Sequence, residues 1–349
     1  MSTTTQNPTP LAPDAGATVG RRLSSARVLL AGLGNIGSFL AVLLAPLVGL
    51  IRLVDRDSIE VRNATNQLYR PEDQGQAKVD VVARQIAGTT PQLQVERRIA
   101  DVEDLPWEDY ADVDIVMAGL DSLRARQLLL EKHYPLNIPY IDGAVGDPLL
   151  ARVQVLLPGQ ACLECNWAPL QYRQLMREVP CRPNAPPNEA PRTMAPGCAG
   201  AAVAAVMVAQ CMRLFSEDPP RESYEIYGDL LAGRFVQYRR GRNVQCRYRH
   251  EVAPQLLPLE APLSLATVAD LIDVVRQHFA GQRVQLEFRR GILGNALFAT
   301  DRLAEPEQLR PLWNRRLSEM GLTPRDRVVV RAVAASRAAH ICFDSPTKG

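Results

Sequence analysis

The chain has 349 residues, of which 46% are hydrophobic. This length allows about two domains with hydrophobic cores of their own, and the composition excludes a disordered or low-complexity protein. The 40 basic residues nearly balance the 38 acidic residues, for a formal charge of +2. That balance argues against nucleic acid as a main partner, because affinity for nucleic acid depends on phosphate neutralisation.

The first 20 residues are rich in Ser, Thr, Pro, Ala and Gly without periodicity, which predicts a disordered arm over 1–20. This arm lacks the apolar core of a signal peptide. The longest apolar runs, 39–51 and 199–209, are shorter than the roughly 18–20 residues that span a bilayer. We therefore expect a cytoplasmic protein with no membrane segment.

Residues 21–252 alternate between strand and helix patterns. An apolar, β-branched run over 27–31 precedes a glycine turn, an apolar helical stretch to Leu44 and a second strand over 50–54. Further strands are expected over 115–118, 139–141 and 153–157, with helices over 77–87 and 122–133. This alternation predicts an α/β fold, a doubly wound and mostly parallel Rossmann-like sheet with helices on both faces.

The pattern breaks over 166–197, which is rich in Pro, Asn, Arg and Glu and has no clear periodicity. A stretch of that length inside a compact domain indicates a functional crossover loop. A helix of small residues is expected next, over 199–214.

Residues 253–349 predict a linker, over 254–262, and a second, small α+β domain. Its expected order is a helix over 268–279, strands over 284–288 and 296–299, an amphipathic helix over 309–320 that stops at Gly321, and strands over 327–333 and 338–343.

The glycine turn indicates a nucleotide site. Glycines at 32, 34 and 37 allow a tight turn and close approach of the backbone to phosphate at a helix N-terminus. Asp55, at the end of the second strand, is placed to hold ribose hydroxyls. On their own these features also fit a nicotinamide dehydrogenase.

The polar residues that follow favour ATP over NAD. Asp57 is a second carboxylate, and Asn63, Lys78 and Asp121 come after successive elements, where ligands of parallel sheets collect. Lysine can neutralise a triphosphate, and a carboxylate at a strand end can hold Mg²⁺. The alternatives are a solvated lysine on a helix face and an Asp121 that only caps a helix.

Seven cysteines are spread over the chain, and two of them form Cys162-Leu163-Glu164-Cys165. This spacing indicates metal or thiol chemistry before disulfides. Two such thiolates can bind one side of a tetrahedral zinc ion, which then needs a second pair of ligands. Ordinary thiols are the alternative.

Over about 21–250 the chain resembles the E1-like adenylation family, which activates ubiquitin-like and sulfur-carrier proteins. The stretches that carry the resemblance are Gly32-Leu33-Gly34-Asn35-Ile36-Gly37, Asp55-Arg56-Asp57-Ser58-Ile59-Glu60, Arg70-Pro71-Glu72-Asp73-Gln74-Gly75-Gln76-Ala77-Lys78, Gly119-Leu120-Asp121-Ser122 with Arg126, and Ile138-Pro139-Tyr140-Ile141-Asp142-Gly143. The Gly-Leu-Asp-Ser and Cys-Leu-Glu-Cys stretches are most similar to the catalytic subunit of the NEDD8-activating enzyme.

The resemblance implies roles for the nucleotide residues. Asp55 binds ribose, Lys78 contacts the phosphates and Asp121 holds Mg²⁺. The glycines, Asp57, Asn63 and Arg126 complete the implied site. One departure is that Asn63-Ala64-Thr65-Asn66-Gln67 lacks the arginine that the family carries here. Arg62, Arg70, Arg21, Arg22 or a second subunit of an expected homodimer are candidate replacements.

The resemblance also implies a structural zinc and a nucleophile. Cys246 and His250 look like the second half of a Cys₃His zinc site with Cys162 and Cys165. The nucleophile that forms a thioester with the carrier is expected at Cys181, with Cys198 as the second choice. Cys211 and Cys342 are expected in the core.

The element order of 253–349 resembles the ubiquitin-fold domain with which E1 enzymes dock an E2. We therefore expect an E1-type enzyme that adenylates a ubiquitin-like protein with Mg-ATP, forms a cysteine thioester and passes it to an E2. The alternatives are a sulfur-carrier adenylyltransferase and a non-catalytic scaffold that binds the carrier.

Overall fold

The computed structural model describes residues 22–349, except 62, 64–65, 147–148, 179–194, 247, 249, 251, 253–254, 260, 290–302, 305, 324–325, 334–337 and 344–349. The predicted arm over 1–20, Cys181 and the predicted strand over 296–299 lie outside the described residues.

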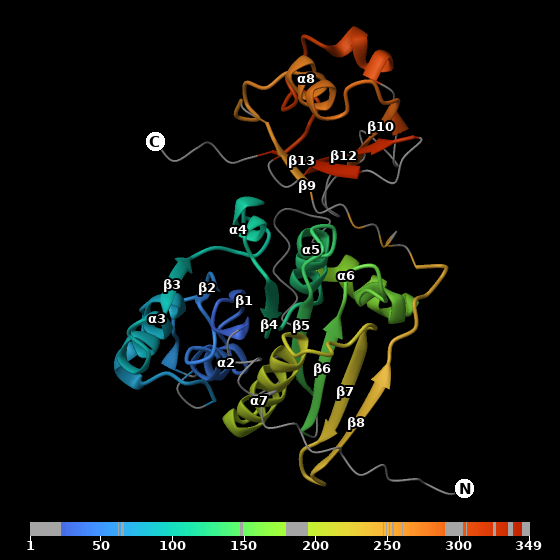
Figure 1. Ribbon diagram of the computed structural model, residues 1–349. Helices are drawn as coiled ribbons and strands as arrows, with labels where there is room; N and C mark the ends of the chain where they lie inside the picture. The colour runs from blue at the N-terminus through green and yellow to red at the C-terminus, as the bar shows by residue number, and fades with distance from the viewer. Residues whose placement is uncertain are drawn as a thin grey trace, which may run out of the picture.

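Within the described residues, eight strands form the larger sheet (Figure 1). They are β1 Arg27–Ala31, β2 Leu50–Val54, β3 Gln94–Arg98, β4 Ile115–Ala118, β5 Tyr140–Gly146, β6 Leu150–Leu156, β7 Tyr224–Asp229 and β8 Arg234–Arg239, in the order β3-β2-β1-β4-β5-β6-β7-β8. Strands β3 to β5 are parallel, and β6, β7 and β8 extend the sheet in antiparallel fashion. The predicted α/β fold with a mostly parallel Rossmann-like sheet is confirmed. The strand expected over 153–157 was wrongly placed in its parallel part.

Helices cover both faces of this sheet. They are α2 Gly37–Leu44, α3 Lys78–Thr89, α4 Glu108–Ala111, α5 Leu123–His133, α6 Pro169–Glu178 and α7 Gly197–Leu214, with 3₁₀ turns η2 Pro71–Asp73 and η3 Leu163–Asn166. Leu40, Val82 and Met207 belong to the core on one face, and Tyr110 and Leu129 to the core on the other. Strands β1, β2 and β4 are apolar in almost every position because both faces are covered. Helix α6 corrects the prediction of an irregular loop over 166–197.

Helix α7 begins two residues before the helix predicted over 199–214 and is longer than the apolar run 199–209 within it. In the described part of the chain it is the one helix long and apolar enough, by length and composition, to cross a membrane. In this structure it packs against β5 and α2, and Val203, Ala204 and Met207 are fully buried. A Cβ on Gly143 would lie 2.4 Å from the Met207 sulfur, so this glycine allows α7 to approach the sheet closely.

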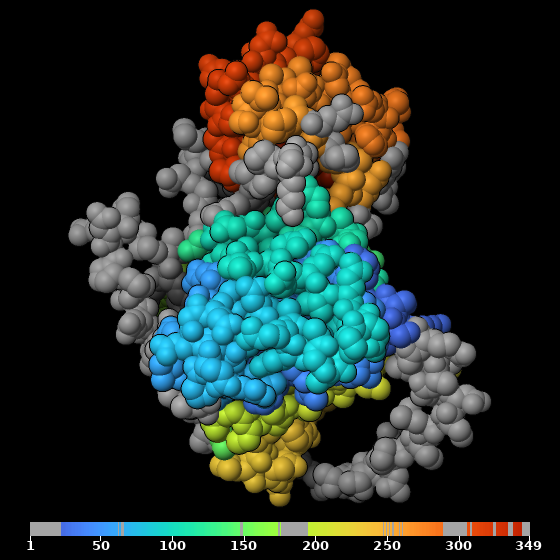
Figure 2. Space-filling model, turned by 90° about the vertical axis from the view of Figure 1, so that its left-hand side faces the viewer, coloured from blue at the N-terminus to red at the C-terminus, as the bar shows by residue number. Residues whose placement is uncertain are grey.

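A second sheet forms the C-terminal domain. Its described strands are β9 Gln255–Pro258, β10 Val284–Arg289, β11 Leu303–Ala304, β12 Arg327–Ala332 and β13 Ala338–Cys342, in the order β11-β10-β12-β13-β9. Helix α8 Val268–His278 begins at a Thr267–Asp270 capping box, and its Leu271 and Val275 pack on Leu286 and Val330. In the space-filling view, the orange and red C-terminal residues lie above the teal residues of the first domain (Figure 2).

Two predictions for this domain were wrong. The expected linker over 254–262 contains β9, which pairs in parallel with β13. The helix expected over 309–320 is instead η4 Pro306–Leu312 followed by turns. Pro311 lies inside η4, and proline removes a backbone donor that a continuing α-helix needs.

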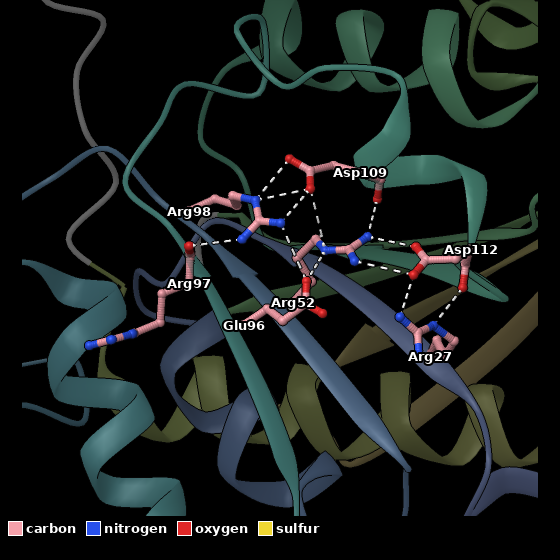
Figure 3. A network of polar contacts seen from close by, with 7 residues as sticks. All are labelled: Arg27, Arg52, Glu96, Arg97, Arg98, Asp109 and Asp112. Carbon is pink, nitrogen blue, oxygen red and sulfur yellow. Dashed lines mark hydrogen bonds and ion pairs between the residues drawn. The ribbon is translucent and has the colours of Figure 1, made fainter. Parts of the chain in front are cut away.

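A network of ion pairs attaches α4 to β2 and β3 (Figure 3). The buried Arg52 side chain donates to Glu96 at 2.7 Å and to Asp112 at 2.9 Å, and it also donates to the backbone of Asp109. Arg98 donates to the Asp109 carboxylate at 2.7 Å. Because a buried guanidinium is costly without partners, this network fixes the position of α4 on the sheet edge.

Candidate nucleotide site and metal centre

The glycine turn follows β1 directly. Gly32 has φ +81°, a conformation that favours glycine, and a Cβ on Gly37 would lie 1.7 Å from the Gly32 carbonyl oxygen. Nothing lies within 4 Å of where a Gly34 Cβ would stand. The turn is therefore tight on one side and open at Gly34, and α2 begins immediately after it. This arrangement lets an anion approach the first amides of α2.

Asp55 follows β2 and holds the turn in place. One carboxylate oxygen accepts from the Leu33 amide at 2.6 Å, and the other accepts from the Asp57 amide at 2.8 Å. Burial raises the pKa of Asp55, while the neighbouring Lys78 and these two amides act to lower it. The carboxylate is oriented before any ligand binds, as a ribose-binding group needs to be.

Lys78, the first residue of α3, forms an ion pair with Asp57. Its Nζ lies 3.0 Å from the Asp57 carboxylate, and its side chain is 8% exposed while that of Asp57 is 56% exposed. Lys78 is therefore not a solvated lysine on a helix face. The ion pair fixes the Lys78 ammonium group near the glycine turn. Asp57 lies two residues after Asp55, and Asp55 accepts from the Leu33 amide of that turn.

Asp121 follows β4 and is exposed. Ser122, rather than Asp121, caps α5, because the Ser122 hydroxyl accepts from the Ala125 amide at 3.3 Å. The helix-cap alternative for Asp121 is therefore wrong. The Asp121 carboxylate therefore does not cap α5, and it lies at the same edge of the sheet as Asp55.

Arg126 lies one turn into α5 and is buried. Its guanidinium donates to Asp142 at 2.8 Å and to the carbonyl of Gly143 at 3.1 Å. Asp142 pairs in register with Ala118, the last residue of β4, so this buried pair stands directly behind the Asp121 edge. Sequence reasoning did not assign Asp142 a role, although a carboxylate in an apolar strand was an available signal.

The N-terminus of α7 lies against the glycine turn. Asn35 and Asn66 both donate to the Ala195 carbonyl, at 2.9 and 3.2 Å. Cys198 is exposed in the first turn of this helix. The structure thus places Cys198 beside the candidate nucleotide site.

The remaining predicted nucleotide residues are more peripheral. The Asn63 side chain accepts from the Glu60 amide at 2.8 Å and so stabilises its own loop. Among the candidate replacement arginines, Arg70 is exposed beside Glu72, and Arg22 donates to the Ser216 carbonyl at 3.5 Å. Arg62 and Arg21 lie outside the described residues.

Cys162, Cys165, Cys246 and His250 come together, with their ligand atoms all within 4.8 Å of one another. The Cys162 sulfur lies 3.9 Å from that of Cys165 and 3.7 Å from that of Cys246, and the Cys165 sulfur lies 3.0 Å from Nε2 of His250. Tetrahedral zinc with bonds of about 2.3 Å places two sulfurs about 3.8 Å apart. The donor set and its spacing therefore fit zinc.

The surroundings favour a thiolate at Cys165. The hydrogen bond between the two sulfurs lowers the pKa of Cys165 and raises the pKa of Cys162. The Asn243 amide lies 3.4 Å from the Cys165 sulfur. The buried Arg240 donates to the carbonyls of Cys162 and Leu163 and to Glu225 at 2.9 Å. Sequence reasoning missed Arg240 and Asn243, which donate to backbone carbonyls of the turn over 162–165 and so hold it in place.

An apolar face lies on the antiparallel extension of the sheet. We define it by Leu150, Tyr227, Val236 and Tyr238, four exposed side chains from β6, β7 and β8. The strand register places them on one face, and the Tyr227 and Tyr238 rings are 5.9 Å apart. Arg152, opposite Tyr227, lies 3.9 Å from Asp142 and so connects this apolar face with the Arg126–Asp142 pair.

Residues 9–252 match the ThiF family. The chain belongs to the ThiF family. The predicted resemblance to the E1-like adenylation proteins is thereby confirmed. The NEDD8-activating enzyme E1 catalytic subunit of Saccharomyces cerevisiae is 32% identical over 160 residues, which cover 42% of this chain and 53% of that protein.

Another relative of this ThiF-family chain is the probable adenylyltransferase/sulfurtransferase MoeZ of Mycobacterium tuberculosis, 28% identical over 238 residues. That match covers 65% of this chain and 54% of MoeZ, so the chain spans about half the length of these two relatives. Escherichia coli MccB, in a structure with AMPCPP and MccA, superposes with a TM-score of 0.51 at 22% identity, over 66% of this chain and 68% of MccB. The likeness to MccB shows the fold.

Proposed function

We propose that this ThiF-family chain uses Mg-ATP to adenylate the C-terminal carboxylate of a ubiquitin-like or sulfur-carrier protein. The observation that carries the proposal is the set of groups at one sheet edge: the open glycine turn, the oriented Asp55, the Lys78–Asp57 pair and the exposed Asp121. NEDD8-activating and MoeZ-type relatives support the carrier class.

The reaction assigns a role to each group. The carrier carboxylate attacks the α-phosphorus of ATP, the bond to the bridging oxygen breaks, and pyrophosphate leaves. The amides at the start of α2 and the Lys78 ammonium stabilise the phosphate charge, and Asp55 holds the ribose. Asp121 supplies an oxygen ligand for Mg²⁺, which neutralises charge on the leaving pyrophosphate.

The apolar face offers a docking surface for the carrier protein. Its aromatic side chains are exposed on the sheet extension, and Arg152 lies between it and the buried Arg126–Asp142 pair. Exposed apolar patches of this kind mark interaction sites in soluble proteins. A carrier seated there can extend its C-terminus along Arg152 toward the nucleotide edge.

The decisive measurement is ATP–pyrophosphate exchange with purified ubiquitin-like proteins that end in glycine. Lys78→Ala and Asp121→Ala are expected to lower the exchange rate about 100-fold or more, because each removes a group that stabilises phosphate charge. Asp80→Ala is the matched control, since Asp80 lies on the same helix as Lys78 but pairs with Arg97. Exchange that survives in both site variants would contradict the assignment, and ATP binding without exchange would favour the scaffold alternative.

The E1-type proposal adds a thioester. The thiolate of Cys181, or of Cys198, attacks the acyl carbon of the carrier adenylate, and AMP leaves. The position of Cys198 beside the glycine turn supports it as a candidate. An E2 that docks on 253–349 would then receive the acyl group, whereas a sulfur-carrier adenylyltransferase needs no such domain.

Intact-mass spectrometry after incubation with Mg-ATP and the carrier separates these alternatives. A thiol-sensitive mass gain that is lost only in Cys181→Ala assigns that nucleophile, and loss only in Cys198→Ala assigns the other. Cys211→Ala is the control, because Cys211 is buried and its pKa is raised by burial to about 12. Pyrophosphate release with no mass gain in any variant favours the sulfur-carrier alternative.

A further inference from the structure

Helix α5 joins the nucleotide edge to the C-terminal domain. It begins directly after Asp121 and Ser122, and its first turns carry Arg126, which is bound to Asp142. The helix has eleven residues and is therefore about 16 Å long. Its other end lies beneath the sheet of the C-terminal domain (Figure 1).

Arg327, the first residue of β12, holds that other end. Its guanidinium donates to the backbone carbonyl of Glu131 and lies 3.0 Å from the Glu131 carboxylate. The Glu131 carbonyl is one of the last four in α5. These carbonyls have no backbone N–H donor within the helix. Arg327 therefore caps α5 from another domain, and its positive charge is placed favourably at the negative end of the helix dipole.

A tryptophan packs against the same contact between α5 and β12. The ring of Trp107 lies 4.2 Å from Nζ of Lys132, 5.4 Å from the Arg327 guanidinium carbon and 6.2 Å from the parallel His340 ring of β13. Trp107 and His340 are each 2% exposed, and the Arg327 side chain is 4% exposed. Trp107 directly precedes α4, which the Arg52 network fixes on the sheet. The C-terminal sheet thus contacts Trp107, which precedes α4, and the end of α5 through Arg327 and His340.

We infer that Arg327 is a positioning residue for the adenylation site: by capping α5 it holds the Asp121 edge and Arg126 in the geometry that binds Mg-ATP. The inference rests on the proposed function, and it assigns residues 253–349 a task that is independent of any E2. A rigid helix transmits a shift at its C-terminus to its N-terminus, because its backbone hydrogen bonds make it one body.

The test compares wild type with Arg327→Ala, Arg327→Lys and Arg331→Ala. Arg331 lies on the same strand, but its ion-pair partner is Glu287 of β10, so its loss disturbs the C-terminal sheet without uncapping α5. The dissociation constant of Mg-ATP is measured by calorimetry, and KM and kcat by pyrophosphate exchange.

Arg327→Ala is expected to raise the dissociation constant and the KM for Mg-ATP about tenfold, with a smaller change in kcat. Arg327→Lys keeps a cationic donor and is expected to recover most of the affinity, and Arg331→Ala is expected to stay within twofold of wild type. An unchanged affinity in Arg327→Ala, or an equal loss in Arg331→Ala, overturns the inference. A wild type that binds ATP without exchange contradicts the proposed function alone, whereas a wild type that binds no ATP contradicts both.

Discussion

The candidate nucleotide site at the sheet edge and the candidate metal cluster gather polar side chains in opposite ways. At the edge, each group follows its own strand or starts the next helix, and Asp57 and Asp121 are exposed. In the cluster, Cys162, Cys165 and His250 are buried, and the ligands come from segments about 80 residues apart. The exposed edge groups are available to a ligand at little cost in stability. The buried cluster groups are part of the fold itself.

The largest expected effect breaks the cluster. Cys165→Ser is expected to lose one equivalent of bound zinc and to lower the midpoint of thermal unfolding by about 10 °C or more, because zinc binding contributes directly to folding free energy. Metal content by mass spectrometry and a thermal melt measure this. Cys211→Ser, another buried cysteine outside the cluster, is expected to keep its zinc. Full zinc content in Cys165→Ser would show that the ligand set is wrong.

A smaller effect tests a buried group on α5, which lies between the two regions. Burial lowers the pKa of His133 from 6.5 to about 4. As pH falls below 6.5, the unfolded chain binds a proton at His133, whereas the folded chain does so only near pH 4. The free energy of unfolding therefore decreases as the pH falls from 6.5 to 4, by about 3 kcal/mol over the whole range.

Denaturant unfolding between pH 7 and pH 4 measures this loss. His133→Asn is expected to be less stable at pH 7 but to lose about 3 kcal/mol less than wild type on acidification, because it has no proton to take up. Parallel pH profiles of the two proteins would contradict a neutral, buried His133.

The smallest expected effect on stability comes from a variant at the nucleotide edge instead of the metal cluster. Asp121→Ala, which removes an exposed carboxylate without a capping role, is expected to change the free energy of unfolding by less than about 0.5 kcal/mol while it lowers the exchange rate about 100-fold or more. The same denaturation measurement checks it. A loss of several kcal/mol would mean that Asp121 is structural, like the cluster.

The strand ends explain how much of the candidate nucleotide site could be predicted. The glycine turn, Asp55, Lys78 and Asp121 follow local patterns, and parallel strands bring their carboxyl ends to one edge by topology alone. The Arg126–Asp142 pair and the partner of Lys78 could not be predicted, because they depend on which side chains meet across elements.

The C-terminal domain shows more clearly which features could not be predicted from the sequence. Helix α8 was predicted from its periodicity and cap, but 309–320 was predicted as a helix although Pro311 interrupts it. The apolar pattern of that segment reflects packing against α8 and β10, and a 3₁₀ turn can satisfy such packing as well as an α-helix can.

By itself the sequence determined the family, the parallel strands with their glycine turn, and the residue types at each strand end, because these depend on local periodicity and short spacing. Only the tertiary structure decided that β6 to β8 run antiparallel, that Arg240 and Asn243 support the cysteines, and that Arg327 caps α5. Those contacts join residues from about 80 to almost 200 positions apart. Their free energy exists only when the packed core brings the two segments together.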